Sequence, residues 1–196
     1  MGALERDSEL LFRDATVYIG EIEDRYLTGE VRRKVFHGAF KLPLVKTDNE
    51  RVRLRDGEIV EIGDIRVECL LVPGHTWGHM VYLVDDEYLF TGDTVWFGAD
   101  GGYSFLNVLA EDNALALRSL EKLEKELRSR KQPLKIITGH TGWTDDLDFA
   151  FRHRTAICRP FTKKYSDPSA PYDGYVEDDD TEESARNVPL GKVGTK

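Results

Sequence analysis

The sequence predicts a single domain of the α/β class, and three observations support this prediction. The chain has 196 residues, of which 40% are hydrophobic and 10% aromatic, a composition that fits one globular domain with its own core. Apolar runs typical of strands alternate along residues 1–162 with stretches of helical spacing. A histidine and an aspartate also lie in glycine-containing turns at the ends of predicted strands. We therefore expect a sheet with packed helices, and a functional site at the strand ends.

The first predicted elements are a strand, a helix and a hairpin. ATVYIG (15–20) is typical of a strand, and EIEDRYL (21–27) is typical of a short helix. GEIVEIG (57–63) and DIRVECLLV (64–72) have the pattern of two strands joined by a tight turn at a glycine. We therefore expect an antiparallel pair in this part of the chain.

A second hairpin is predicted where the chain reads MVYLVD and then EYLFTG, with a turn at Asp85-Asp86. A hairpin of this length returns the chain to where it began. His75, in the turn before the first strand, would then lie near Asp93, in the turn after the second. Imidazole and carboxylate groups brought together in this way form half of a metal site.

The following stretch is predicted to contain a loop and the longest helix. WFGADGGYSFLN (96–107) is rich in glycine and aromatic residues and is expected to be a loop. Residues Glu111 to Arg130 form the strongest helical pattern, which Pro133 should end. The three-and-four spacing of one buried face is kept by Leu117, Leu120, Leu123 or Glu124, and Leu127.

The last predicted elements surround a second histidine in a glycine-containing turn. LKIIT (134–138) is a short strand that leads directly to His140. After Thr144, which is a suitable N-cap, DDLDFAFRHR (145–154) is expected to be another helix. Residues 163–196 have three prolines, an acidic run and no periodic apolar face, so we expect a flexible tail there.

Composition also excludes several classes of function. The formal net charge of −9 argues against a nucleic-acid partner or an anionic membrane surface. Neither a membrane-spanning apolar segment nor a signal peptide is evident, so a cytoplasmic location is the expectation. Cys69 alternates with apolar residues in a predicted strand and is interpreted as a buried thiol; with Cys158 it forms no CxxC pair.

Three short motifs, in this order and spacing, carry a resemblance to a known family. PGHTWGH (73–79), LFTGDT (89–94) and ITGHTG (137–142) resemble the metallo-β-lactamase superfamily, over about residues 15–151. Within that superfamily the chain looks most like hydroxyacylglutathione hydrolases of the glyoxalase II type. The resemblance implies an αββα sandwich with a site for one or two metal ions at one sheet edge. It also implies a small-molecule substrate.

The resemblance further implies which residues bind metal. His75 would bind the first ion, His140 the second, and Asp93 would bridge both and be the catalytic carboxylate. Histidine and carboxylate are the usual ligands of zinc, and iron or manganese is an alternative for the same ligand set. A metal-bound water with a pKa of about 7 would then attack an ester, thioester or amide bond, lactams and lactones included.

One family motif has no counterpart in this sequence. The first metal-binding motif, HxHxDH, is absent, and no histidine precedes His37. We therefore expect a fold that is incomplete at its N-terminus, as if the chain began directly after that motif. His75, Asp93 and His140 would leave each of two metal ions only two ligands, so we expect weak metal binding and impaired hydrolysis.

Three functional hypotheses follow from this departure. The chain is a metallo-hydrolase whose missing ligands come from elsewhere, a non-catalytic relative that acts as a binding module, or a mononuclear iron persulfide-dioxygenase-like member. Association into homo-oligomers is left open. Whether this chain is itself an active enzyme is likewise left open by the sequence.

Other candidate residues carry weaker signals. His79 begins a strand and is interpreted as support for the loop, whereas His37 and His153 lie outside any motif and are assigned surface or core roles. Three aromatic residues have two readings, as the lining of a substrate pocket or as ordinary packing: Trp96, Phe97 and Tyr103.

Overall fold

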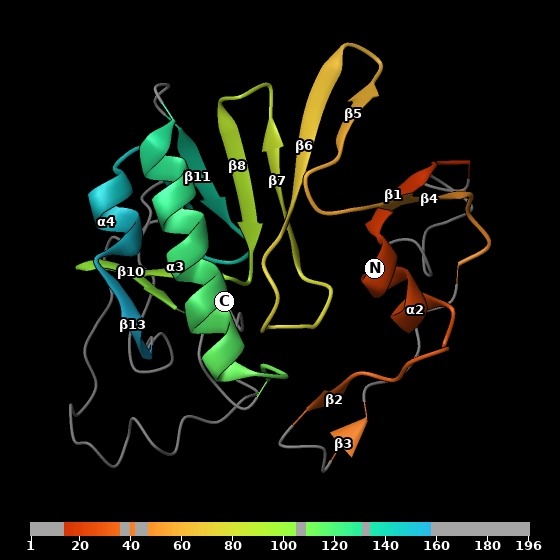
Figure 1. Ribbon diagram of the computed structural model, residues 1–196, viewed down its shortest axis with the longest axis horizontal. Coiled ribbons are helices and arrows are strands. Elements are labelled where there is room, and N and C mark those ends of the chain that lie inside the picture. The colour runs from red at the N-terminus through yellow and green to blue at the C-terminus, as the bar shows by residue number, and fades with distance from the viewer. Residues whose placement is uncertain (1–13, 36–39, 42–46, 105–108, 131–133, 158–196) are drawn as a thin grey trace.

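A six-stranded sheet lies at the centre of the protein (Figure 1). The computed structural model describes residues 14–35, 40–41, 47–104, 109–130 and 134–157. The strands follow the order β12-β11-β8-β7-β6-β5. Their bounds are β5 (Ile59–Ile62), β6 (Ile65–Leu71), β7 (Met80–Val84), β8 (Tyr88–Gly92), β11 (Lys135–Thr138) and β12 (Trp143–Thr144). Strands β5 to β8 are antiparallel neighbours, and β11 joins β8 in parallel.

Both predicted hairpins are confirmed. The β7–β8 turn has positive φ angles at Asp85 (51°) and Asp86 (56°), and the Glu87 amide donates to the Val84 carbonyl at 3.0 Å. Two positive φ angles are typical of a type I′ turn, whose twist suits antiparallel strands. The β5–β6 turn uses Gly63, with φ of 67°.

One face of the sheet is covered by α3 (Asn113–Ser129), as the leucine spacing predicts (Figure 1). Leu120, Leu123 and Leu127 are buried in the main core. The sheet contributes Val81, Leu83, Leu89 and Ile136 to the same core. The helix begins at an N-cap, Asp112, whose carboxylate accepts a hydrogen bond from the Leu115 amide at 2.8 Å.

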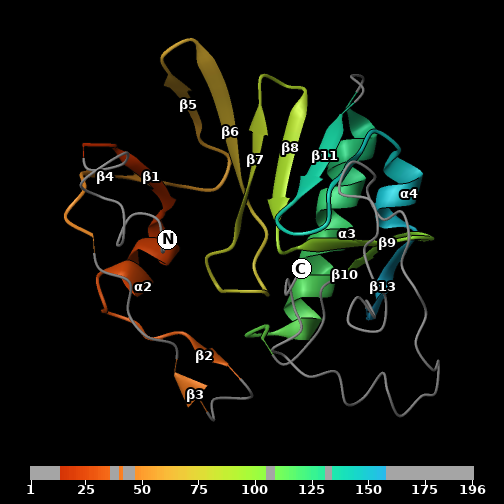
Figure 2. The same cartoon turned by 180° about the vertical axis from the view of Figure 1, so that it is seen from behind.

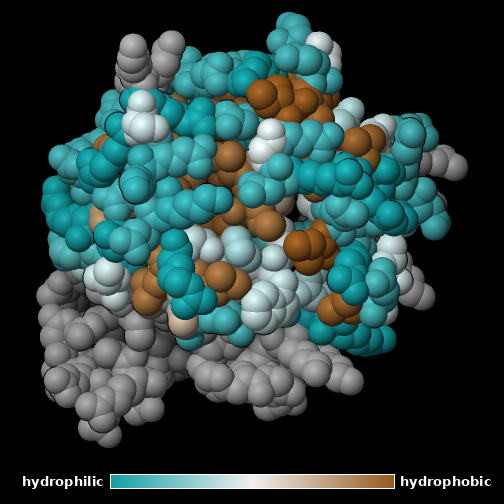
Figure 3. Space-filling model, viewed as in Figure 1, coloured by the Kyte–Doolittle hydropathy of each residue, from teal (hydrophilic) through white to brown (hydrophobic). Residues whose placement is uncertain are grey.

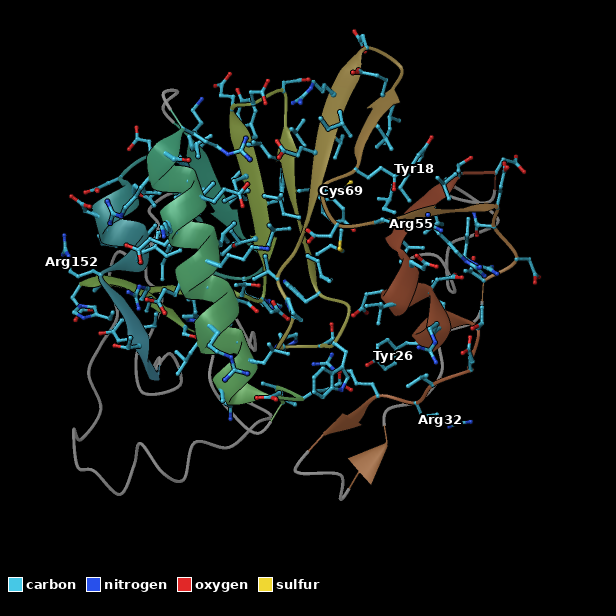
Figure 4. All side chains as sticks on the ribbon, viewed as in Figure 1. Tyr18, Tyr26, Arg32, Arg55, Cys69 and Arg152 are labelled. Carbon is cyan, nitrogen blue, oxygen red and sulfur yellow. The ribbon has the colours of Figure 1, made fainter. Side chains whose placement is uncertain are left out.

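The opposite face of the sheet is covered only in part. Here β1 (Val17–Gly20) pairs in parallel with β4 (Arg51–Leu54), and α2 (Glu21–Leu27) follows β1. Tyr18 packs against the second core cluster, which includes Leu54 and the buried thiol Cys69, and Figure 4 labels Tyr18 and Cys69 on the two sides of this contact. Farther along the same face, Phe90 on β8 is 43% exposed and Trp143 on β12 is 48% exposed.

The prediction of a loop at residues 96–107 is wrong for most of that segment. Strands β9 (Val95–Gly98) and β10 (Gly101–Ser104) form an antiparallel hairpin, and residues 105–107 lie outside the described residues. Every residue of β9 is buried, so the strand lacks the alternation of polar and apolar residues that identifies a half-exposed strand. Its glycine and aromatic content therefore suggested a loop.

The helix expected at 145–154 is also corrected. Helix α4 covers only Leu147–Phe151, and the chain then forms β13 (His153–Ile157), which pairs with β10 in a sheet of order β13-β10-β9 (Figure 2). The N-cap is Asp146, whose carboxylate accepts from two backbone amides, whereas the expected cap, Thr144, belongs to β12. Pairing with β10, which is distant in sequence, outweighs the local helical pattern.

Two short strands, β2 (Lys34–Val35) and β3 (Phe40–Lys41), complete the described elements. No helix in the described part of the chain is long and apolar enough to cross a membrane. The surface seen in Figure 3 is mainly hydrophilic, with smaller hydrophobic areas between the polar residues. The predicted tail at 163–196, Pro133 and His37 lie outside the described residues.

Candidate metal centre

The three predicted ligands lie at one end of the central sheet, each shortly after a strand. His75 follows β6, Asp93 follows β8, and His140 follows β11. Strands β6, β8 and β11 run in the same direction, because β7 is antiparallel to both of its neighbours and β11 is parallel to β8. The residues that follow these three strands therefore meet at one end of the sheet.

The Asp93 carboxylate lies between the two histidines. His75 Nε2 is 3.3 Å from Asp93 Oδ2, and His140 Nε2 is 3.1 Å from Asp93 Oδ1. His75 is buried, Asp93 is mostly buried, and His140 is the most accessible of the three. The convergence that the sequence predicts for these side chains is confirmed.

The backbone on both sides of His75 is fixed against the start of α3. Gly74 approaches the helix so closely that an added Cβ would lie 2.3 Å from Ala116 Cα. The amide of Glu111 donates to the His75 carbonyl at 3.1 Å, and the amide of Asp112 donates to the Gly74 carbonyl at 3.0 Å. The glycine of this motif is thus required by contact with the helix.

A carboxylate that the sequence analysis did not single out connects the same loop to α2. Glu111 Oε2 accepts a hydrogen bond from the Tyr26 hydroxyl at 2.7 Å and another from the Trp77 amide at 2.8 Å. The Thr76 hydroxyl donates to Glu23 on the same helix. Both helices therefore hold the His75 loop, through residues that carry no local sequence signal for this role.

His140 and Asp93 are positioned by close packing between their two turns. An added Cβ on Gly139 would lie 2.9 Å from Asp93 Oδ1, so a glycine leaves the space that the carboxylate needs. The Gly139 amide donates to the Gly92 carbonyl at 2.8 Å. The ring of Trp96 stacks on His140, with centroids 5.5 Å apart, so it supports the imidazole from inside the protein.

The remaining sequence candidates lie in supporting or separate positions. His79 Nε2 donates to the Thr91 carbonyl at 3.0 Å, which agrees with its interpretation as loop support. Phe97 is fully buried in the core. Tyr103 donates to Asp100, in the exposed turn between β9 and β10, at 2.9 Å and stacks on His153.

An arginine that the sequence analysis did not single out contacts the candidate centre. Arg33 Nη2 is 2.8 Å from His75 Nε2 and donates to the Leu109 carbonyl at 3.0 Å. Arg33 is 42 residues from His75 in sequence and lies between α2 and β2, outside every motif. Only the fold brings it to the site.

The protonation states favour metal ligands. Burial, together with the neighbouring charge of Arg33, lowers the pKa of His75 to about 3, so the imidazole is neutral at physiological pH. Burial alone would raise the pKa of Asp93, but the hydrogen bond from His140 and the nearby histidines hold it below its usual range. The same hydrogen bond raises the pKa of His140.

The spacing of the donor atoms also fits a metal. Two ligands of a tetrahedral zinc, each about 2.0 Å from the ion, lie roughly 3.3 Å apart. The two N–O separations at Asp93 are 3.3 and 3.1 Å. Within the described residues no three His, Cys, Asp or Glu side chains already enclose a single cation position. The three candidate residues therefore form two pairs that share Asp93, and among the described residues they do not enclose a cation position.

Comparison with curated proteins finds relatives that cover part of the chain. No protein-family profile matches. A hydroxyacylglutathione hydrolase-like protein from Mus musculus is 35% identical over 104 residues, which is 50% of this chain and 34% of that protein. The probable polyketide biosynthesis zinc-dependent hydrolase PksB of Bacillus subtilis (strain 168) is 33% identical over 46% of this chain and 37% of its own length. The chain thus spans well under two thirds of these relatives.

Solved structures with the same fold share little sequence with this chain. The metallo-β-lactamase superfamily protein ST1585 from Sulfolobus tokodaii has a TM-score of 0.50 at 18% identity, covering 71% of this chain and 57% of that one. TTHA1623 in a di-iron-bound form also has a TM-score of 0.50, at 22% identity, covering 78% of this chain and 69% of that one. At these identities the likeness concerns the fold alone.

Proposed function

Because this chain has the metallo-β-lactamase fold and resembles hydroxyacylglutathione hydrolases in sequence, we propose that its site belongs to a metal-dependent hydrolase. The bond cleaved is an ester, thioester or amide bond of a small molecule, lactams and lactones included. The ligands are His75, Asp93 and His140, and the metal is zinc, with iron or manganese as alternatives. The observation that carries this proposal is the Asp93 carboxylate, which presents one oxygen to each histidine.

Each side chain has a defined part in the proposed chemistry. A metal held by these residues would supply a hydroxide at neutral pH and would polarise the carbonyl under attack. Asp93, which is ionised and mostly buried, provides the negative charge that attracts a cation. Its Oδ2 lies beside His75 and its Oδ1 beside His140, so the one carboxylate serves both histidines. His75 is neutral and so has a nitrogen lone pair for coordination. Trp96 keeps the ring of His140 in place.

The number of ligands limits the activity that we propose for these residues alone. A catalytic zinc ion usually has three protein ligands and one open position. The sequence contains no HxHxDH motif, so two ions that share Asp93 would have two protein ligands each. We therefore propose that this chain by itself binds metal weakly and hydrolyses its substrate slowly.

One structural feature favours a second candidate function, a non-catalytic binding module. Arg33 contacts the same His75 nitrogen that would bind a metal ion. A site held together by a guanidinium needs no metal to be stable. Such a chain would bind a partner through its surface and would not catalyse hydrolysis.

Metal content and turnover, measured together, test the proposal. The chain and its Asp93→Ala variant are loaded separately with zinc, iron and manganese, dialysed and analysed for bound metal. They are then assayed on a panel of thioesters, lactones and β-lactams. We expect less than one zinc per chain, loss of that zinc in Asp93→Ala, and hydrolysis close to background.

The matched control is His153→Ala, because His153 is a half-buried histidine on β13 that lies with Asp100 and Tyr103, away from the three candidate ligands. This variant should keep the zinc of the unaltered chain. If Asp93→Ala binds as much metal as the chain itself, the proposed site is wrong. Stoichiometric, tightly bound metal with fast turnover would instead disprove the proposed impairment.

A further inference from the structure

The contact between Arg33 and His75 fixes the role of one nitrogen atom. A guanidinium has five N–H donors and no acceptor. Arg33 Nη2, at 2.8 Å, must therefore donate to His75 Nε2, which accepts through its single lone pair. That lone pair is the one that a metal ion at Asp93 would use, because the same nitrogen lies 3.3 Å from Asp93 Oδ2. One lone pair cannot serve a hydrogen bond and a metal at once.

From this geometry we propose that Arg33 is a built-in cation that occupies the metal-binding nitrogen of His75, so that the guanidinium and a metal ion bind His75 in mutually exclusive states. This inference rests on the proposed metal site. Arg33 is therefore a residue that sets the metal affinity of the centre. Removing its side chain should strengthen metal binding.

The surroundings of Arg33 support both states. In the state that the structure shows, the guanidinium also donates to the Leu109 carbonyl, so a metal ion must displace a side chain with two partners. Arg33 lies between α2 and β2, in a segment that is neither helix nor strand. Its long side chain can leave His75 by a change of rotamer, without movement of a helix or a strand. Repulsion between the two cations would drive the guanidinium away once the metal is bound.

The neighbouring arginine provides a matched control. Arg32 has the same charge and nearly the same place in the chain, but it is exposed and points away from the body of the protein (Figure 4). Arg32→Ala and Arg33→Ala change the net charge equally. Any difference between the two variants therefore reports the contacts that Arg33 makes with His75 and Leu109.

The first experiment measures zinc affinity by competition with a chromophoric chelator, starting from metal-free protein. We expect Arg33→Ala to bind zinc about tenfold more tightly than the unaltered chain, because the metal no longer has to break a charge-assisted hydrogen bond. Arg32→Ala should match the unaltered chain. Without metal, Arg33→Ala should also unfold at a lower urea concentration than Arg32→Ala, because the cation on His75 is missing.

The second experiment uses the unaltered chain and does not depend on the folding of a variant. The ¹⁵N signals of the arginine guanidinium groups and of the histidine rings are followed by NMR during a zinc titration. We expect the Arg33 signal and His75 Nε2 to shift together as zinc is added. The Arg32 signal should stay constant.

The outcomes separate this inference from the proposed function. If zinc binds, but with equal affinity in the unaltered chain and Arg33→Ala, the inference is wrong and the proposed metal site stands. If zinc binds to neither protein, the proposed metal site is wrong and the inference is overturned with it. If Arg33→Ala fails to fold, an Arg33 signal that does not move while zinc binds overturns the inference.

Discussion

At the scale of single residues, the sequence indicates the candidate ligands but not what surrounds them. His75, Asp93 and His140 could be predicted because each follows a strand in a short glycine-containing motif. Arg33 and Glu111 could not, because their contacts with the His75 loop join segments that are distant in sequence. A single sequence shows only the identity of a residue and its neighbours along the chain. The roles of Arg33 and Glu111 depend instead on which segments pack against the His75 loop in the fold.

The buried imidazole of His75 predicts a pH-dependent loss of stability in the metal-free chain. In the folded state its pKa is lowered to about 3, whereas an unfolded histidine titrates near 6.5. Below about pH 6.5 the unfolded chain therefore binds a proton that the folded chain does not. This contribution to stability is present above that pH and is lost as the pH falls. Urea unfolding in EDTA should show a lower midpoint at pH 5 than at pH 7.

His140 should act in the opposite direction, which provides an internal control. Its pKa is raised in the folded state by the hydrogen bond to Asp93, so its contribution is present below about pH 6.5 and is lost as the pH rises through the folded value. The loss of stability between pH 7 and pH 5, measured as the fall in the urea midpoint, should therefore be smaller in His75→Gln and larger in His140→Gln. An unchanged loss in His75→Gln would show that another group causes it.

At the scale of secondary-structure elements, the predictions succeed where one face of an element is buried and the other is exposed. Helix α3 has a leucine face, and the β7–β8 hairpin has turn residues that tolerate positive φ. The β9–β10 hairpin is buried on nearly all sides, so its sequence contains no alternation from which to identify it. The start of β13 continues a helical pattern, and only pairing with β10 determines that it is a strand.

The contact between Gly74 and α3 predicts a large loss of stability in Gly74→Ala. The new methyl group would lie 2.3 Å from Ala116 Cα, so the loop that carries His75 or the helix would have to move. Gly57→Ala is the control for a positive φ without a close contact: φ is 74° at Gly57 and 141° at Gly74, and nothing lies within 4 Å of a Cβ added to Gly57. The backbone strain alone should lower the free energy of unfolding by about 1–2 kcal/mol in Gly57→Ala. Urea denaturation should show a clearly greater loss in Gly74→Ala, and equal losses would contradict the role of the contact.

At the scale of the whole molecule, the two faces of the central sheet differ in how well they are covered. Helix α3 and the β9 segment bury the face that contains Leu83 and Leu89. On the other face, β1 and β4 pack over β6 and β7, where Cys69 and Met80 are buried. The α/β class and most of the element order could be predicted from the sequence. The extent of this coverage could not, because it depends on how the β1–β4 pair is placed over the sheet.

The partly covered face predicts self-association of the chain. Phe90 (43% exposed) and Trp143 (48% exposed) pair on either side of Ile137, so they form one apolar strip across β8, β11 and β12. Exposed apolar area of this kind favours contact between molecules because it removes the strip from water. We expect sedimentation velocity to show species larger than a monomer, and the double variant Phe90→Ser, Trp143→Ser to shift the protein towards monomer.

The control for this prediction is Trp77→Ser. Trp77 is as exposed as Trp143, at 48%, but it lies in the loop next to His75 and outside the strip. Loss of one exposed tryptophan from that loop should leave the association unchanged, because the apolar strip is intact. If Trp77→Ser weakens association as much as the double variant does, the sheet face is not the contact surface. If the unaltered chain sediments as a monomer at all concentrations, the prediction is wrong, and the β1–β4 pair already covers enough of the sheet to prevent association.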